Sequence, residues 1–164
     1  MTENNKFNVL LVCTGNTCRS AMAEGIARKI ASEKNADNLR FGSAGTGMLE
    51  GMPATDYAIQ AAAHWDVDIS GHRSRGITKT LIDDADLILA MAPEHVQAIL
   101  AMNKKSASKV FLIKSFPEPF NVNQERVDDP IGGTLDLYNQ TFLELDELIR
   151  RIFPRILEYS HLHE

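Results

Sequence analysis

The chain has 164 residues, of which 44% are hydrophobic and 24% charged, and its formal net charge is −5. This length and composition predict one domain with a sizeable core and exclude global disorder. The negative charge argues against nucleic acid or an anionic membrane as the main partner. No apolar run approaches the roughly 18 residues of a membrane span, and the polar opening residues 1–7 are unlike a secretion signal. We therefore expect a cytoplasmic protein with a single domain over residues 1–164, in which residues 1–6 are flexible.

The first half of the chain predicts two strands and two helices. Residues 7–12 are apolar enough for a strand that is covered on both faces, and a helix follows over residues 19–32. Residues 39–43 predict a short second strand that leads into a glycine-rich crossing. Pro53 is placed to open a helix that runs through Trp65.

The second half predicts a short helix from Thr78, a buried strand over 85–91, a helix from Pro93 and a fourth strand over 109–113. Residues 114–133 then predict a long loop, which in a compact domain is usually functional or mobile. After it, apolar residues step by three and four, which indicates a long amphipathic helix with Pro154 as the place for a kink. Three heptads are short for a coiled coil, so packing on the sheet is favoured.

Strands that alternate with helices predict an α/β fold with a parallel sheet. In such sheets, ligands bind beyond the carboxyl ends of the strands. The segments that follow the first, second and fourth strands should therefore converge on one rim.

A small polar loop joins the first strand to the first helix, beginning at Cys13 and ending at Arg19 and Ser20. Its backbone N–H groups and the positive end of the helix dipole favour an anion, and they favour a thiolate at Cys13. Arg19 can offer two parallel N–H donors to an oxyanion, and Ser20 can either donate to the sulfur or cap the helix. Taken alone, Cys13 would be interpreted as a small core residue and Arg19 as a solvated helix residue. Together they predict covalent phosphoryl transfer.

Cys18 is the other cysteine of the chain and lies in the same loop. A disulfide across so short a loop would stabilise little, and zinc ligands are not available nearby, so we expect no metal. Cys18 has two open interpretations. It either traps an oxidised Cys13 in a reversible disulfide or fills space in the core.

The leaving group of a phosphoryl transfer needs a proton donor. The long loop supplies Asp129, which is followed by Pro130. Proline restricts the residue before it to an extended conformation and so gives the carboxylate a defined direction. The segment by itself suits a plain turn. Beside the loop of Cys13 and Arg19, we interpret Asp129 as the acid.

Five motifs together resemble the low-molecular-weight protein tyrosine phosphatase family over almost the whole chain. They are CTGNTCRS at 13–20, SAG at 43–45, GHR at 71–73, ADLILAM at 85–91 and DP at 129–130. The resemblance implies a four-stranded parallel sheet of the flavodoxin or Rossmann-like type and no cofactor or metal. The sequence departs from the family pattern at Ala21, where proline is usual. This difference affects the stability of the helix start more than the chemistry of the site.

The resemblance also implies roles for individual residues. Cys13 would be the nucleophile, Arg19 the phosphate ligand and Asp129 the acid and later the base. The rest of the phosphate-binding loop would be Thr14, Gly15, Asn16, Thr17, Cys18 and Ser20. Ser43 and His72 would support the shape of the loop together with Asn16.

The family contains phosphatases for phosphotyrosine and for phosphoarginine. Thr17 stands where the tyrosine enzymes commonly have isoleucine, and a hydroxyl can accommodate a polar guanidinium group. Ile131 and Gly132 stand where the tyrosine enzymes usually place aromatic rings against a phenol. These features favour phosphoarginine, with phosphotyrosine as the alternative.

Three other classes of protein are alternatives to a phosphatase. A redox enzyme of the same fold needs further cysteines after Cys18, and none follows. A non-catalytic phosphate-binding module or phosphocysteine carrier would need no acid, so Asp129 argues against it. Assembly through the long C-terminal helix is the third. We expect phosphorylated proteins as substrates and a monomer or weak dimer.

Overall fold

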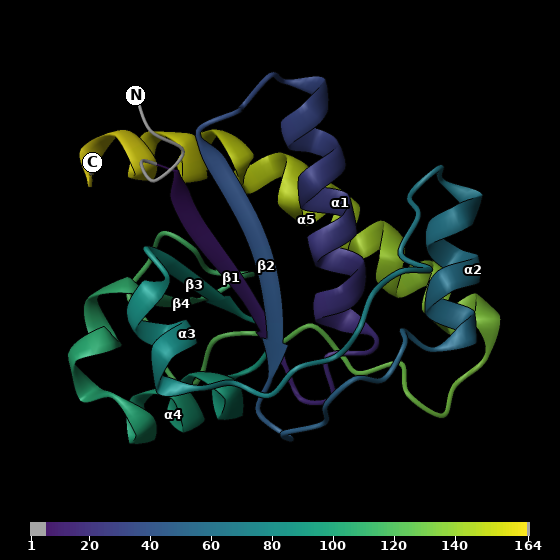
Figure 1. Cartoon of the computed structure of the whole chain (residues 1–164), viewed down its shortest axis with the longest axis horizontal. Coiled ribbons are helices and arrows are strands. Elements are labelled where there is room, and N and C mark those ends of the chain that lie inside the picture. The colour runs from purple at the N-terminus through teal and green to yellow at the C-terminus, as the bar shows by residue number, and fades with distance from the viewer. Residues whose placement is uncertain (1–5, 164) are drawn as a thin grey trace.

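The computed structural model describes residues 6–163. One sheet contains four parallel strands, namely β1 (Phe7–Cys13), β2 (Leu39–Gly45), β3 (Leu87–Ala90) and β4 (Val110–Leu112). The strands lie in the order β2-β1-β3-β4, so the first strand of the chain is central (Figure 1). The predicted four-stranded parallel α/β fold is confirmed.

Helices cover both faces of the sheet because both faces of each strand are apolar. Val9 and Leu11 belong to one core and the alternate residues Leu10 and Val12 to the other. The first core is covered by α1 (Arg19–Glu33), α2 (Asp56–His64) and α5 (Leu135–Leu162). The second is covered by α3 (Lys79–Asp84) and α4 (Pro93–Met102).

The ends of some elements differ from the prediction. The helix expected from Pro53 begins only at Asp56, because the Thr55 side chain accepts a hydrogen bond from the Ala58 amide and caps the helix there. A short 3₁₀ helix, η2 (Lys104–Lys109), precedes β4 and was not predicted. The long helix α5 packs into the first core, as expected, and it runs through Pro154 as one helix.

The carboxyl ends of the strands form the predicted rim. Hydrogen bonds between backbone groups join the segments there, from the amide of Thr46 to the carbonyl of Cys13 at 2.9 Å and from Val127 to Met91 at 2.8 Å. β2 lies on one side of β1 and β3 on the other, so the connections diverge at the end of β1. Such a switch point is where open α/β sheets bind ligands. Cys13 is the last residue of β1 and lies at this point.

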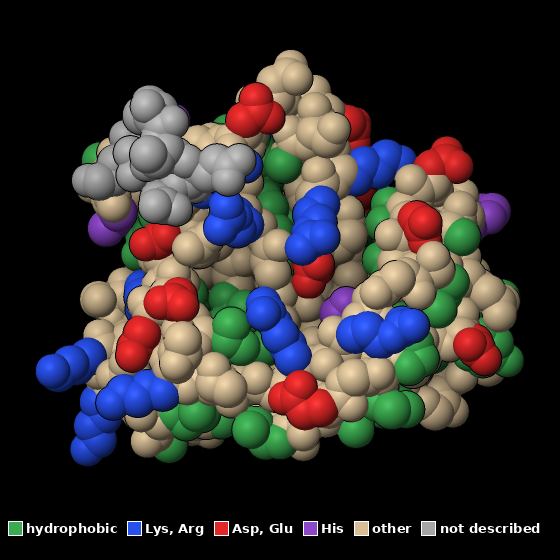
Figure 2. Space-filling view, in the orientation of Figure 1, with side chains coloured by type: hydrophobic (Ala, Val, Ile, Leu, Met, Phe, Trp, Pro, Cys, Tyr) green, Lys and Arg blue, Asp and Glu red, His purple; other side chains and the backbone are tan. Residues whose placement is uncertain are grey.

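One face of the molecule carries charged side chains of both signs over α1 and β2 (Figure 2). A cavity of about 550 Å³ opens there, and its lining includes Glu24, Arg28, Ser43, His72 and Arg75. No helix within residues 6–163 is long and apolar enough to cross a lipid bilayer.

Candidate active site

The loop of residues 13–20 closes around the sulfur of Cys13. The Cys13 side chain is buried, and its Sγ atom receives a hydrogen bond of 3.3 Å from the backbone amide of Asn16. The helix α1 begins at Arg19, and no side chain caps its N-terminus. Uncapped amides at a helix N-terminus bind anions. The loop therefore places a sulfur nucleophile where an anion is favoured.

Ser20 contacts the sulfur directly, with its Oγ 2.9 Å from Cys13 Sγ. The Ser20 oxygen accepts a hydrogen bond of 2.8 Å from the side-chain amide of Asn16. Because the Ser20 oxygen accepts the hydrogen bond from Asn16, the Ser20 hydroxyl hydrogen is available to donate to the sulfur. Of the two predicted roles for Ser20, the structure shows the contact with Cys13, and the helix has no side-chain cap.

Asn16 holds the loop in a conformation that few residues adopt. Its φ angle is 56°, in the left-handed region that asparagine tolerates better than most side chains. Its side-chain amide donates to Ser20 and, at 2.9 Å, to Ser43, and its Oδ1 accepts from the backbone amide of Arg75 at 3.0 Å. The side chain is fully buried. These bonds stabilise the strained loop from beneath.

Ser43 and His72 meet Asn16, as the resemblance implied. The Ser43 hydroxyl accepts from Asn16 and donates to the carboxylate of Glu24 at 2.6 Å. His72 Nε2 lies 2.6 Å from the backbone carbonyl of Asn16. Glu24 and Arg75 complete this network but were not predicted, because nothing in the sequence places them next to residues so far along the chain.

Gly45, at the end of β2, lets the loop approach the sheet. A Cβ atom at this position would overlap the backbone carbonyl oxygen of Thr14 and crowd Asn16. No side chain can therefore be accommodated here without moving the 13–20 loop.

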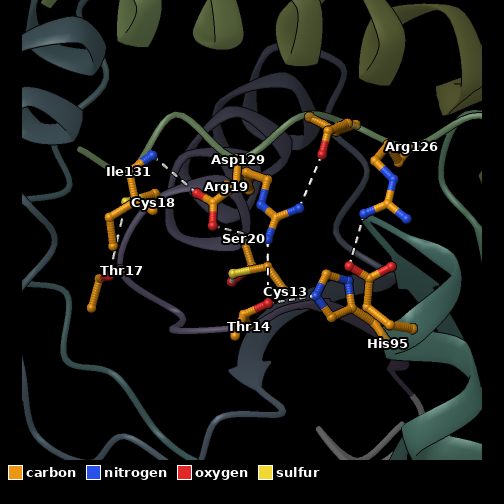
Figure 3. Close-up of polar contacts among 12 residues, drawn as sticks. Cys13, Thr14, Thr17, Cys18, Arg19, Ser20, His95, Arg126, Asp129 and Ile131 are labelled. Atoms are coloured by element: carbon orange, nitrogen blue, oxygen red, sulfur yellow. Dashed lines mark hydrogen bonds and ion pairs between the residues drawn. The ribbon is translucent and has the colours of Figure 1, made fainter. Parts of the chain in front are cut away.

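Arg19 lies above the loop and is almost fully buried (Figure 3). Its Nη1 donates to the carbonyl of Val127 at 3.0 Å. Its Nη2 donates to Thr14 Oγ1 at 3.4 Å and lies 3.5 Å from Asp129 Oδ2. The guanidinium group is thus fixed between the 13–20 loop and the long loop before α5.

Asp129 reaches Arg19 from the long loop before α5. Its Oδ1 accepts a hydrogen bond of 3.1 Å from the amide of Ile131, and its side chain is 38% exposed. One carboxylate oxygen is therefore held by its own loop while the other faces Arg19. The structure brings Cys13, Arg19 and Asp129 together, as the sequence predicted.

Five predicted residues remain to be placed. Gly15 lies next to Thr17 in the loop, where an added Cβ would be 3.4 Å from Thr17 Oγ1. Cys18 is buried, and its sulfur lies 3.4 Å from the hydroxyl of Tyr138. Burial and the contact with Cys18 raise the pKa of Tyr138 to about 12, so that hydroxyl stays protonated and can donate to the sulfur. Thr17 and Ile131 lie near Cys18 in Figure 3, Thr17 buried and Ile131 62% exposed. Gly132 follows with a φ angle of 78°.

His95 reaches the site from α4 and was not predicted. Its Nε2 atom lies 2.8 Å from Thr14 Oγ1. Burial, together with the positive charge of Arg19, lowers the pKa of His95 to about 4, so the imidazole is neutral near pH 7. The sequence carried a usable signal, because His95 lies in the first turn of a helix that follows the carboxyl end of a buried strand.

No group of three or more His, Cys, Asp or Glu side chains within residues 6–163 is arranged to hold a metal ion. The chemistry available from the described side chains is that of a sulfur nucleophile, a fixed guanidinium group and a carboxylate near both.

Comparison with known proteins identifies relatives of the whole domain. A protein-arginine-phosphatase of Bacillus subtilis (strain 168) is 37% identical over 150 residues, which cover 92% of this chain and 97% of the relative. The low molecular weight protein-tyrosine-phosphatase Etp of Escherichia coli (strain K12) is 34% identical over 134 residues, covering 77% and 87%. A solved structure of the YwlE arginine phosphatase, a cysteine-to-serine mutant with a phosphorylated active-site serine, superposes with a TM-score of 0.84 at 35% identity and covers 92% of this chain and 95% of that one.

The family model described as low molecular weight phosphotyrosine protein phosphatase matches residues 8–161. That range contains the sheet apart from Phe7, the first residue of β1, together with the 13–20 loop, Asp129 and nearly all of α5. The chain belongs to the low molecular weight phosphotyrosine protein phosphatase family.

Proposed function

We propose that this protein hydrolyses phosphorylated side chains of proteins through a phosphocysteine at Cys13, without a metal, and that phosphoarginine is the favoured substrate. The observation that carries the proposal is the position of the Cys13 sulfur, inside an anion-binding loop and beneath an arginine that contacts Asp129. The phosphorylated active-site serine in the YwlE mutant supports a covalent intermediate at the equivalent place.

In the first step the Cys13 thiolate attacks phosphorus. A sulfur–phosphorus bond forms while the bond from phosphorus to the leaving nitrogen or oxygen breaks. Asp129 donates its proton to the leaving nitrogen or oxygen, so that the leaving group does not depart as an anion. The Arg19 guanidinium and the loop amides stabilise the charge on the phosphoryl oxygens. The Ser20 hydroxyl, 2.9 Å from the sulfur, can donate a hydrogen bond to the Cys13 thiolate before the attack.

In the second step water hydrolyses the phosphocysteine. The Asp129 carboxylate accepts a proton from water as its oxygen attacks phosphorus, and the phosphorus–sulfur bond breaks. Cys13 returns as a thiolate, Asp129 returns as an acid and inorganic phosphate leaves. The same carboxylate is used twice, which fits its exposed position at the entrance.

Three observations support phosphoarginine. The segment after Asp129 offers Ile131 and Gly132 in place of aromatic rings, which leaves little to stack on a phenol. Thr17 adds a hydroxyl beside Cys18, and the relative with 37% identity is a protein-arginine-phosphatase. Phosphotyrosine is the second candidate, because Etp, the relative with 34% identity, is a tyrosine phosphatase.

The deciding experiment measures turnover of matched phosphoarginine and phosphotyrosine peptides, with Cys13→Ser as the blank. Faster phosphoarginine turnover that decreases or inverts in Thr17→Ile supports the proposed preference. Faster phosphotyrosine turnover would overturn the preference for phosphoarginine, while the proposed phosphatase activity would stand. No turnover of either peptide would overturn the hydrolase and favour a phosphocysteine carrier.

We further propose a cytoplasmic protein that acts as a monomer or weak dimer and binds neither nucleic acid nor membranes. The net charge of −5 supports the proposal that it binds neither nucleic acid nor membranes. Size-exclusion chromatography with light scattering tests the oligomeric state, and a stable dimer at micromolar concentration would contradict it.

A further inference from the structure

We propose that His95 is a positioning residue that directs the hydroxyl of Thr14 toward the phosphoryl group. This inference rests on the proposed function, because it needs a phosphoryl group in the 13–20 loop. It concerns residues outside the set of Cys13, Arg19 and Asp129 that performs the bond changes.

The contact between His95 and Thr14 joins α4 to the 13–20 loop. His95 is fully buried, and its Nε2 lies 2.8 Å from Thr14 Oγ1. Thr14 Oγ1 also accepts a hydrogen bond of 3.4 Å from Arg19 Nη2. One hydroxyl oxygen therefore links the histidine to the arginine that binds phosphate (Figure 3).

The other nitrogen of His95 indicates which tautomer is present. Among the described residues Nδ1 has no hydrogen-bond partner. A neutral imidazole carries one N–H, and a buried N–H without an acceptor is rarer than an acceptor left unpaired. The proton therefore belongs on Nε2, where Thr14 Oγ1 can accept it.

This tautomer fixes the direction of the Thr14 proton. The Thr14 oxygen then accepts from both His95 Nε2–H and Arg19 Nη2–H, which occupy its two lone pairs. Its own hydrogen must point away from both donors. The acceptor that the reaction brings to this place is an oxygen of the phosphoryl group, so Thr14 becomes an additional donor to it.

Two substitutions at Thr14 and two at His95 distinguish the proposed positioning role from a role in packing. His95→Gln places an amide N–H near the position of Nε2, whereas the shorter His95→Asn places it near that of Nδ1. Thr14→Ser keeps the hydroxyl and Thr14→Val removes it with little change of volume. Glu94→Gln, next to His95 on the surface of α4, is the matched control.

We expect His95→Asn and Thr14→Val each to lower kcat/KM about tenfold, since a hydrogen bond to a charged group is being lost. His95→Gln, Thr14→Ser and Glu94→Gln should stay within about threefold of the wild type. In the Thr14→Val background, His95→Asn should have no further effect, because both act through one hydroxyl.

Additive losses in the double variant, or equal losses in His95→Gln and His95→Asn, would overturn the proposal. Affinity for inorganic phosphate, measured by calorimetry in the Cys13→Ser protein, gives a readout that does not need turnover. A weaker affinity in Cys13→Ser/His95→Asn than in Cys13→Ser/His95→Gln would support the positioning role even if the wild type hydrolysed no phosphopeptide. Equal affinities together with normal turnover in all variants would refute the role and leave the proposed function intact.

Discussion

The guanidinium group of Arg19 and the carboxylate of Asp129 contact each other, with Nη2 and Oδ2 3.5 Å apart. Arg19 is buried, whereas Asp129 is 38% exposed, so water screens the pair from one side only. The negative charge of Asp129 partly neutralises the guanidinium group that we propose binds phosphate. A dianion that enters the 13–20 loop must therefore compete with this carboxylate or meet it protonated.

Asp129→Asn should consequently separate binding from catalysis. Without the competing charge, inorganic phosphate should bind about fivefold more tightly, while kcat falls most for substrates with poor leaving groups. Competitive inhibition by phosphate gives the affinity, and a series of leaving groups gives the dependence of kcat. Asp128→Asn removes the same charge from the neighbouring position and is the control. Equal tightening in both variants would mean that the contact with Arg19 has no specific effect.

Gly45→Ala tests the close approach between β2 and the 13–20 loop. The added methyl group overlaps the carbonyl oxygen of Thr14, so the loop must move and kcat/KM should fall at least about tenfold. Gly71→Ala adds the same methyl group where nothing lies within 4 Å and should leave activity unchanged. Steady-state kinetics and thermal melts of both variants provide the comparison. Full activity in Gly45→Ala would show that the loop tolerates displacement.

Asn16 combines a positive φ angle with side-chain bonds, and two substitutions distinguish these contributions. Asn16→Gly and Asn16→Ala both remove the bonds to Ser20 and Ser43, so both should lose at least about tenfold in kcat/KM. Only alanine must also adopt a φ angle of 56°, so it should be less stable than glycine by about 1 kcal/mol. Urea denaturation measures the difference. If alanine were as stable as glycine, the loop would not be strained at this position.

His95 should make stability depend on pH. Its pKa is lowered from 6.5 to about 4 in the folded protein by burial and by Arg19, with Arg126 acting in the same direction and Glu94 and Asp129 against it. The unfolded chain binds the proton first as pH falls, so stability is complete above pH 6.5 and declines between 6.5 and 4. Relative to His95→Gln, the wild type should lose about 2 kcal/mol between pH 7 and pH 5. Parallel urea titrations at the two pH values test this, and a constant difference would contradict it.

The fold was predictable because its signals are local. The apolar strands and the helices between them imply a parallel sheet, and the loop after the first strand must then lie at its carboxyl edge. Cys13, Arg19 and Asp129 could be found because each lies in a recognisable segment of that rim.

The support of the loop was harder to predict. Glu24 and Arg75 act through contacts with Ser43 and Asn16, and the sequence gives no indication of such long-range pairs. The late start of α2 depends on one hydrogen bond of Thr55, which competes with the preference of proline for a first turn. His95 was missed because its contact with Thr14 joins residues that lie far apart in the chain.

Val127 links the long loop that carries Asp129 both to the sheet and to Arg19. Its amide donates to Met91 at the end of β3, and its carbonyl accepts from Arg19. Local opening of this segment would break both bonds at once, displacing Asp129 and leaving Arg19 without its strongest anchor. Heating should therefore inactivate the enzyme below the temperature at which the sheet melts, and amide hydrogen exchange at Val127 should report the same opening. We therefore expect the two backbone hydrogen bonds of this one residue to set the thermal limit of activity.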